Sequence, residues 1–110
     1  MEDKTNSKEK KISKITKDTW NLDHAFLKWL KPRLKCYYQD ASKIIDLEQH
    51  KFTFRGATLT QKQIIERMNE ILKKYNDRNF YYFSDDATES ENYLTELLEL
   101  WSLVFPTMWW

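Results

Sequence analysis

The stretch TQKQIIERMNEIL, residues 60–72, carries the clearest structural signal in the chain. Thr60 and Gln63 match a capping box, in which each side chain bonds the backbone amide of the other residue at the start of a helix. Apolar residues then recur every three or four positions, which places them on one helical face. They are Ile64, Ile65, Met68, Ile71, Leu72 and Tyr75. Lys73 and Lys74 followed by Asn76 could end this helix, whereas Tyr82 and Phe83 continue the same face and would allow it to extend to about residue 83.

A helix is also predicted before this stretch. It should start near Thr19, a good N-cap residue, with Asp23 in the first turns to favour the helix dipole. Its apolar residues at helical spacing are expected to be buried. They are Leu22, Phe26, Trp29, Leu30 and Tyr37. Pro32 lies inside the pattern and clashes with the carbonyl of Lys28, so a kink is expected there.

A third helix is predicted after the sequence SDD at residues 84–86. Thr88 and Glu91 could form another capping box, and the paired carboxylates of Asp85 and Asp86 at the helix start are also explained by capping. A strong apolar row follows at helical spacing, and Pro106 should end the helix. The row consists of Leu94, Leu97, Leu98, Trp101 and Phe105.

Between the first two helices, Phe52 and Phe54 alternate with polar residues, which allows at most one short β element. Three amphipathic helices bury their apolar faces best around a common core. The predicted fold class is therefore all-α, a small bundle of three main helices with the first kinked at Pro32. Residues 1–18 are predicted to form a flexible basic N-terminal tail, and residues 19–110 a single helical domain.

Composition argues against several classes of protein. The 110 residues include one glycine, where roughly seven are usual, so hairpin-rich folds and nucleotide-binding loops are disfavoured. Cys36 is the only cysteine, so no intramolecular disulfide can form, and this fits a reducing compartment. We expect no signal peptide and no membrane span, because the apolar runs are short and interrupted. The expected location is cytoplasmic.

The residues needed for catalysis are scarce. Cys36 and His24 would lie about three turns apart on one helix, too far for a nucleophile and its base. Asp23 and His24 would need partners from elsewhere to hold a metal, and a hydrogen-bonded or exposed histidine explains them better. His50 has no companion in the sequence. We therefore expect no enzymatic activity, no catalytic residue, no metal and no cofactor.

Charge is distributed unevenly along the chain. Residues 1–78 carry all 18 lysines and arginines and a net charge of +7, whereas residues 79–110 carry −6. Such asymmetry fits a binding face, and it fits equally well a basic and an acidic helix that attract each other within the molecule.

Three sets of residues are candidates for partner contacts. Lys28, Lys31 and Lys35 surround Pro32 together with Arg33 and could hold nucleic acid, although a solvated face explains them as well. An acidic row opposite the leucines of the third helix could enter a basic groove of a partner, or could simply be the polar face of that helix. This row consists of Glu89, Glu96 and Glu99. Trp109 and Trp110 either fold back onto the bundle or serve as exposed anchors for a partner.

Two motifs resemble a known family. The sequence DTWNLD at residues 18–23 and LKWLKPRLK at residues 27–35 resemble the opening of a family of small uncharacterised helical proteins encoded by bacteriophages and prophages. The similarity extends over about residues 18–105 and includes the spacing from Thr60 to Glu66 and Met68. The chain departs from the family pattern at residues 36–38 and 40–58.

The resemblance implies a phage context and brings no catalytic residue. Combined with the missing catalytic motifs, it predicts a protein that acts by stoichiometric contact. The predicted partner is a bacterial host protein or nucleoprotein complex, foremost an anti-phage defence complex such as CRISPR–Cas, which the protein would inhibit or modulate. The alternatives are a nucleic-acid-binding accessory protein of phage replication and a minor structural protein of the phage.

Overall fold

The computed structural model describes residues 15–16, 19–76 and 81–108. The helices are α2 (Leu22–Ile44), α3 (Gln61–Lys73) and α4 (Ala87–Val104), followed by the 3₁₀ turn η1 (Phe105–Thr107). Two strands, β1 (Lys51–Phe54) and β2 (Ala57–Thr60), lie between α2 and α3. Most of the predicted tail and both terminal tryptophans lie outside the described residues. None of the described helices combines the length and the apolar composition that crossing a bilayer requires.

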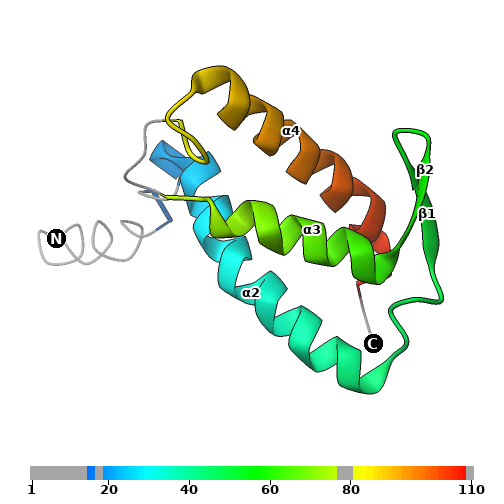
Figure 1. Ribbon diagram of the computed structural model, residues 1–110. Coiled ribbons are helices and arrows are strands. Elements are labelled where there is room, and N and C mark those ends of the chain that lie inside the picture. The colour runs from blue at the N-terminus through cyan, green and yellow to red at the C-terminus, as the bar shows by residue number, and fades with distance from the viewer. Residues whose placement is uncertain (1–14, 17–18, 77–80, 109–110) are drawn as a thin grey trace, which may run out of the picture.

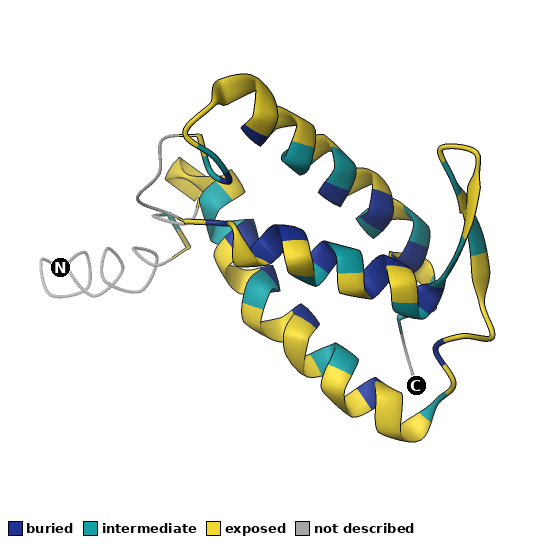
Figure 2. Cartoon of the chain, in the orientation of Figure 1, coloured by how far each residue is buried: buried dark blue, intermediate teal, exposed yellow. Residues whose placement is uncertain are grey.

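Helix α3 lies between α2 and α4 and packs against both (Figure 1). Its chain direction is opposite to theirs, so α2 and α4 run the same way. The core consists mainly of aliphatic side chains from these three helices, and the dark-blue positions in Figure 2 show it facing inward. Tyr75 and Phe83 close one end of this core.

The prediction of an all-α fold with at most one short β element was wrong. Strands β1 and β2 form a two-stranded antiparallel sheet, in which Lys51 pairs with Thr60 and Phe54 with Ala57. The connecting residues Arg55 and Gly56 both have positive φ, of 50° and 83°. Positive φ at both positions is the requirement of a type I′ turn, one of the two common two-residue hairpin turns. The single glycine therefore stands where a hairpin needs it, and the molecule is three helices with a β hairpin.

The predicted start of α3 is confirmed. The Thr60 hydroxyl accepts a hydrogen bond from the Gln63 amide at 3.1 Å, and the Gln63 side chain accepts one from the Thr60 amide at 2.9 Å. The six apolar residues predicted for this face from Ile64 to Tyr75 are all buried. Of the two predicted ends the earlier one is confirmed, because α3 ends at Lys73 with Lys74 as its C-cap. The extension to residue 83 was wrong, and Tyr82 has a positive φ of 71°.

The buried faces of α2 and α4 differ from those predicted. The core positions of α2 are Leu27, Leu30, Leu34 and Ala41, whereas Leu22 is 63% exposed and Trp29 49% exposed. In α4 the core positions are Ser90, Leu97, Leu100 and Val104, whereas Leu98 and Phe105 are exposed. Each helix carries an apolar sector wider than the core can cover. The sequence pattern centred the buried face on the aromatic side chains, and the structure centres it on the aliphatic ones.

Thr19 and Trp20, at the predicted start of the first helix, are helical, but a turn at Asn21 separates them from α2. Asn21 precedes α2 as its N-cap residue without a side-chain capping bond, and Asp23 lies in the first turn as predicted. Helix α2 continues through Pro32 as one element of 23 residues, so this proline does not divide it.

The start of α4 confirms the capping interpretation of the carboxylates at residues 85–86 and corrects the other. The N-cap is Asp86, whose carboxylate accepts a hydrogen bond from the Glu89 amide at 2.9 Å, so Thr88 and Glu91 do not form the predicted capping box. Aspartate serves as well as threonine at an N-cap, and its negative charge favours the positive end of the helix dipole.

Replacement of Asp86 by alanine is expected to lower the free energy of unfolding by about 1 kcal/mol, because the Glu89 amide loses its acceptor. The matched control Thr88→Ala, at an exposed position in the same turn, should change it by less than about 0.5 kcal/mol. Chemical denaturation followed by circular dichroism measures both values. Equal losses in the two variants would contradict the assignment of Asp86 as the cap.

Candidate partner-binding surface

Four aromatic side chains form a continuous row across α2 and α4. Phe26 and Trp29 come from α2, and their ring centroids lie 6.4 Å apart with nearly parallel planes. Phe26 meets Trp101 of α4 edge to face at 6.2 Å, and Trp101 lies 4.6 Å from Phe105. These spacings are those of interacting aromatic pairs. We call these four side chains the aromatic strip.

Helical spacing places the strip on one side of the molecule. On α2, Phe26 and Trp29 lie on the opposite flank from Lys31 and Lys35, which line a groove against α3. On α4, Trp101 lies on the opposite flank from Glu96, which pairs with α3. The strip therefore bridges the two outer helices on the side away from α3.

The two central side chains of the strip are partly buried, and the two outer ones are exposed. Phe26 and Trp101 are half-buried and pack against the core, whereas Trp29 is 49% and Phe105 58% exposed. Leu22, 63% exposed, stands one turn before Phe26, and Leu98, 45% exposed, one turn before Trp101. Both extend the apolar surface. Contiguous exposed apolar residues of this kind mark interaction sites more often than isolated ones do.

A cation borders the strip on α2. The Arg33 guanidinium carbon lies 4.9 Å from the Trp29 ring centroid, within the range of a cation–π interaction. One of its nitrogens also donates a hydrogen bond to the Trp29 carbonyl at 3.0 Å. Trp and Arg are the residue types most enriched among those that dominate binding energy at protein interfaces. The strip has the composition of a protein-binding surface.

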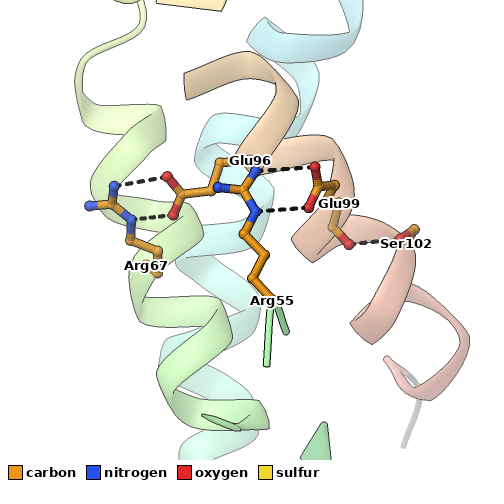
Figure 3. A network of polar contacts seen from close by, with 5 residues as sticks. All are labelled: Arg55, Arg67, Glu96, Glu99 and Ser102. Atoms are coloured by element: carbon orange, nitrogen blue, oxygen red, sulfur yellow. Dashed lines mark hydrogen bonds and ion pairs between the residues drawn. The ribbon is translucent and has the colours of Figure 1, made fainter. Parts of the chain in front are cut away.

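Two of the three glutamates predicted to contact a partner are paired within the molecule. Glu96 accepts two hydrogen bonds from Arg67 of α3, at 2.6 and 3.0 Å (Figure 3). Glu99 accepts two from Arg55 of the hairpin turn, both at 3.1 Å. The Arg55 guanidinium lowers the pKa of the Glu99 carboxyl, and the Glu96 carboxylate raises the pKa of Arg67. The structure thus shows the intramolecular attraction that the uneven charge distribution allowed.

Glu89 stands apart from these pairs. It is exposed and lines a shallow pocket of about 390 Å³ together with Arg55, Tyr93 and Glu96. Glu89 has no ion pair among the described residues. Because only one of the three carboxylates is unpaired, the row offers a partner far less negative charge than its sequence implies.

The predicted basic cluster is divided by the structure. Lys31 and Lys35 line an open groove of about 650 Å³ between α2 and α3, together with Lys73 of α3. Lys31 also donates a hydrogen bond to the Tyr75 carbonyl at 3.3 Å. Lys28 is exposed one turn before Lys31 on the same flank, whereas Arg33 lies over Trp29 on the other flank.

The groove carries both signs of charge. Glu66 and Glu70 line it beside the three lysines, and Glu66 accepts a hydrogen bond from the Tyr38 hydroxyl at 2.8 Å. Its net charge of +1 is modest for contact with a phosphate backbone.

His24 belongs to a hydrogen-bonded cluster at the start of α2. Its Nδ1 lies 2.7 Å from the Tyr75 hydroxyl, and the Tyr82 hydroxyl donates a hydrogen bond to the neighbouring Asp23. Rings of His24 and Tyr82 lie 4.8 Å apart. The cluster ties the end of α3 and the residues before α4 to α2. Among the described residues, no three histidine, cysteine or acidic side chains gather in a way that could hold a metal ion.

Sequence reasoning did not identify the aromatic strip, because it assigned all four side chains to buried faces. The available signal was the width of the apolar sector, since α2 and α4 each carry more apolar positions than one face accommodates.

Trp109 and Trp110 lie outside the described residues. Comparisons with family models, curated proteins and solved structures found no match to the chain.

The Asp23–Tyr82 hydrogen bond predicts a dependence of stability on pH. It lowers the pKa of Asp23 below the usual value of 3.8, so the unfolded chain binds the proton more readily than the folded one. The stabilisation is therefore present above pH 3.8 and is lost as pH falls through the lowered pKa. Denaturant titrations from neutral pH to about pH 2 should show a steeper acid loss for the wild type than for Tyr82→Phe, which lacks the donor. Identical pH profiles would contradict this assignment.

Proposed function

We propose that this chain is a non-enzymatic binding protein that acts by stoichiometric contact and uses the aromatic strip as its principal contact surface. The observation that carries the proposal is the continuous row of half-buried and exposed aromatic rings bordered by Arg33. Exposure of such rings in an isolated molecule costs free energy that burial against a partner recovers. Aromatic side chains also lose little conformational entropy on binding, since few rotatable bonds are fixed.

The construction of the strip supports a role in tight binding. Phe26 and Trp101 are fixed by the core, so the outer rings of Trp29 and Phe105 stand on a rigid base. Anchors held in place before binding reduce the ordering cost of association. A partner with an apolar groove could therefore take up Trp29 and Phe105 without rearrangement of the helices.

We propose a bacterial anti-phage defence complex, such as CRISPR–Cas, as the partner to test first. The support is the resemblance of residues 18–35 to the opening of phage-encoded proteins, together with a surface suited to occupying a partner. On this proposal the protein acts in the cytoplasm of the bacterial host. Trp109 with Trp110 would supply further anchors, whereas Glu89 lies on the flank of α4 that carries Glu96, away from the strip.

Combined replacement of Trp29 and Phe105 by serine is expected to abolish capture of the partner and any protection of phage. Both side chains are about half exposed, so the fold should persist. A tagged pull-down from bacteria that carry different defence systems, identified by mass spectrometry and paired with a phage challenge, measures both effects. Circular dichroism checks that the helical content is unchanged.

The matched control is Ile44→Ser, which removes an equally exposed apolar side chain, 62% exposed, at the far end of α2. This variant should behave like the wild type. Recovery of the same partner by the doubly substituted protein would refute the role of the strip. Unchanged phage restriction across a broad panel, with no defence component recovered, would refute the proposed target.

A second candidate function is nucleic-acid binding through the groove between α2 and α3. The observation that favours it is the convergence of Lys31 and Lys35 from α2 with Lys73 from α3, close to the aromatic ring of Tyr38. Lysines that track a phosphate backbone next to a stacking aromatic are typical of proteins that bind single strands. Lys28 would extend this surface by one turn. Such a protein would serve phage replication as an accessory factor.

For this second function, an electrophoretic mobility shift with random-sequence DNA and RNA should show binding that weakens steeply as salt rises. Lys31→Glu combined with Lys35→Glu should eliminate the shift. The control Lys43→Glu changes the charge equally but lies in the last turn of α2, outside the groove. A wild-type protein that gives no shift at about 50 mM salt would exclude nucleic acid as its partner.

A further inference from the structure

We propose that the free edge of strand β1 is a second binding surface, which takes an extended strand of a partner protein in which apolar and acidic residues alternate. This surface is separate from the aromatic strip, and the inference does not depend on the function proposed for the strip. Three observations lead to it: the backbone groups that β1 leaves unpaired, the position of β1 on the outside of the molecule, and the charge of the hairpin.

The hydrogen-bond pattern of the hairpin shows which backbone groups point outward. The Gln61 amide donates a hydrogen bond to the His50 carbonyl at 2.9 Å, and these two residues continue the register of the strands. In an antiparallel pair, residues that exchange hydrogen bonds alternate with residues that do not. The even-numbered residues of β1 therefore bond β2, whereas the amide and carbonyl groups of Lys51 and Thr53 point away from it. Among the described residues, none bonds these four groups.

Strand β1 is the open edge of the sheet. Strand β2 leads directly into α3 and packs against it, whereas β1 lies on the outer side of the hairpin (Figure 1). The amide of Thr60, at the end of β2, is already bonded by the Gln63 side chain. Lys51 and Thr53 are both exposed. Unpaired groups along a strand edge are a template for one further strand, because an extended backbone matches their spacing.

The two faces of β1 define the side chains that such a strand would carry. Phe52 and Phe54 are half-buried and pack against the core, so an apolar residue beside Phe52 would extend this apolar layer. Lys51 and Thr53 point to the opposite face, toward solvent. An acidic residue directly opposite Lys51 would form a favourable cross-strand pair. The pattern that fits the edge is therefore an alternation of apolar and acidic residues.

The charge of the hairpin favours a partner protein over a second copy of this chain. Residues 49–65 include three basic residues and no aspartate or glutamate. Two of the three are paired within the molecule, Arg55 with Glu99 and Lys62 with Glu48. Lys51 has no ion pair among the described residues. Strand β1 of a second copy would place no acid opposite Lys51, whereas an acidic strand supplies the missing charge.

The probe is a capped peptide about seven residues long that alternates valine and glutamate. Added to the full chain, it should shift the NMR signals of the Lys51 and Thr53 amides and slow their hydrogen exchange. The amides of Phe52 and Phe54 are bonded to β2 and should be protected already. We expect a dissociation constant of about 1 mM or lower, because the edge is short. Unchanged Lys51 and Thr53 amides at about 5 mM peptide would overturn the proposal.

Two variants test the contact itself. Thr53→Pro removes one outward amide and leaves the bonds to β2 in place, so the dissociation constant of the peptide should rise about tenfold or more. The matched control Thr53→Val keeps the amide and should bind like the wild type, and circular dichroism checks both folds. Lys51→Glu, which keeps the whole backbone, should lose this peptide and bind one that carries lysine in place of glutamate. Unchanged binding by Thr53→Pro or by Lys51→Glu would overturn the proposal.

Other occupants of the edge give different results. If random single-stranded DNA changes the Lys51 and Thr53 signals and the peptide does not, the edge contacts nucleic acid and the proposal is refuted. If these two amides become protected as the concentration of the isolated chain rises, a second copy occupies the edge and the proposal is refuted as well. The variant with serine at Trp29 and Phe105 should bind the peptide like the wild type, which separates this surface from the aromatic strip.

Discussion

The structure depends on one helix that is apolar along a full face and covered on both sides. Ile64, Ile65, Met68 and Ile71 of α3 are completely buried. A single neighbouring helix cannot cover a face this wide, so α3 requires both α2 and α4. The capping box at Thr60 fixes where α3 begins and therefore where the hairpin before it must end. The placement of the outer helices, and of everything they carry on their outer flanks, follows from this arrangement.

The outer helices cover α3 mainly with aliphatic side chains, and four of their aromatic side chains lie on the opposite flank: Phe26, Trp29 and Trp101, followed by Phe105 at the end of α4. Large rings next to a narrow three-helix core would leave gaps, whereas leucine and isoleucine fill it at native density. The result is a core that does not need the outer rings of Trp29 and Phe105. A surface that contributes little to the fold can be selected for binding, and this explains how so small a domain carries a large apolar patch.

The sequence predicted those structural features that depend on residues close together in the chain, and it did not predict those that depend on tertiary contacts. The start of α3 and its buried face were predictable, because capping and periodicity are properties of adjacent residues. The hairpin was missed because its turn needs positive φ at both Arg55 and Gly56. Arginine rarely adopts positive φ, so the sequence did not indicate a turn at this position. The glutamates were identified as notable, but the arginines that pair with Glu96 and Glu99 come from α3 and the hairpin, and only the tertiary structure brings them together. The aromatic strip likewise needs two helices side by side.

The order of the elements has a consequence for how the chain folds. The hairpin packs against α3, which follows it, and α3 packs against α4, which comes next, whereas α2 packs against α3 across the short hairpin. Contacts between sequence neighbours require little loop closure before they form, and domains built from them fold on microsecond to millisecond timescales. The hairpin can form early, since its turn spans only Arg55 and Gly56, and it delivers Thr60 to the start of α3. A chain with this connectivity can reach its native state without closing a long loop first.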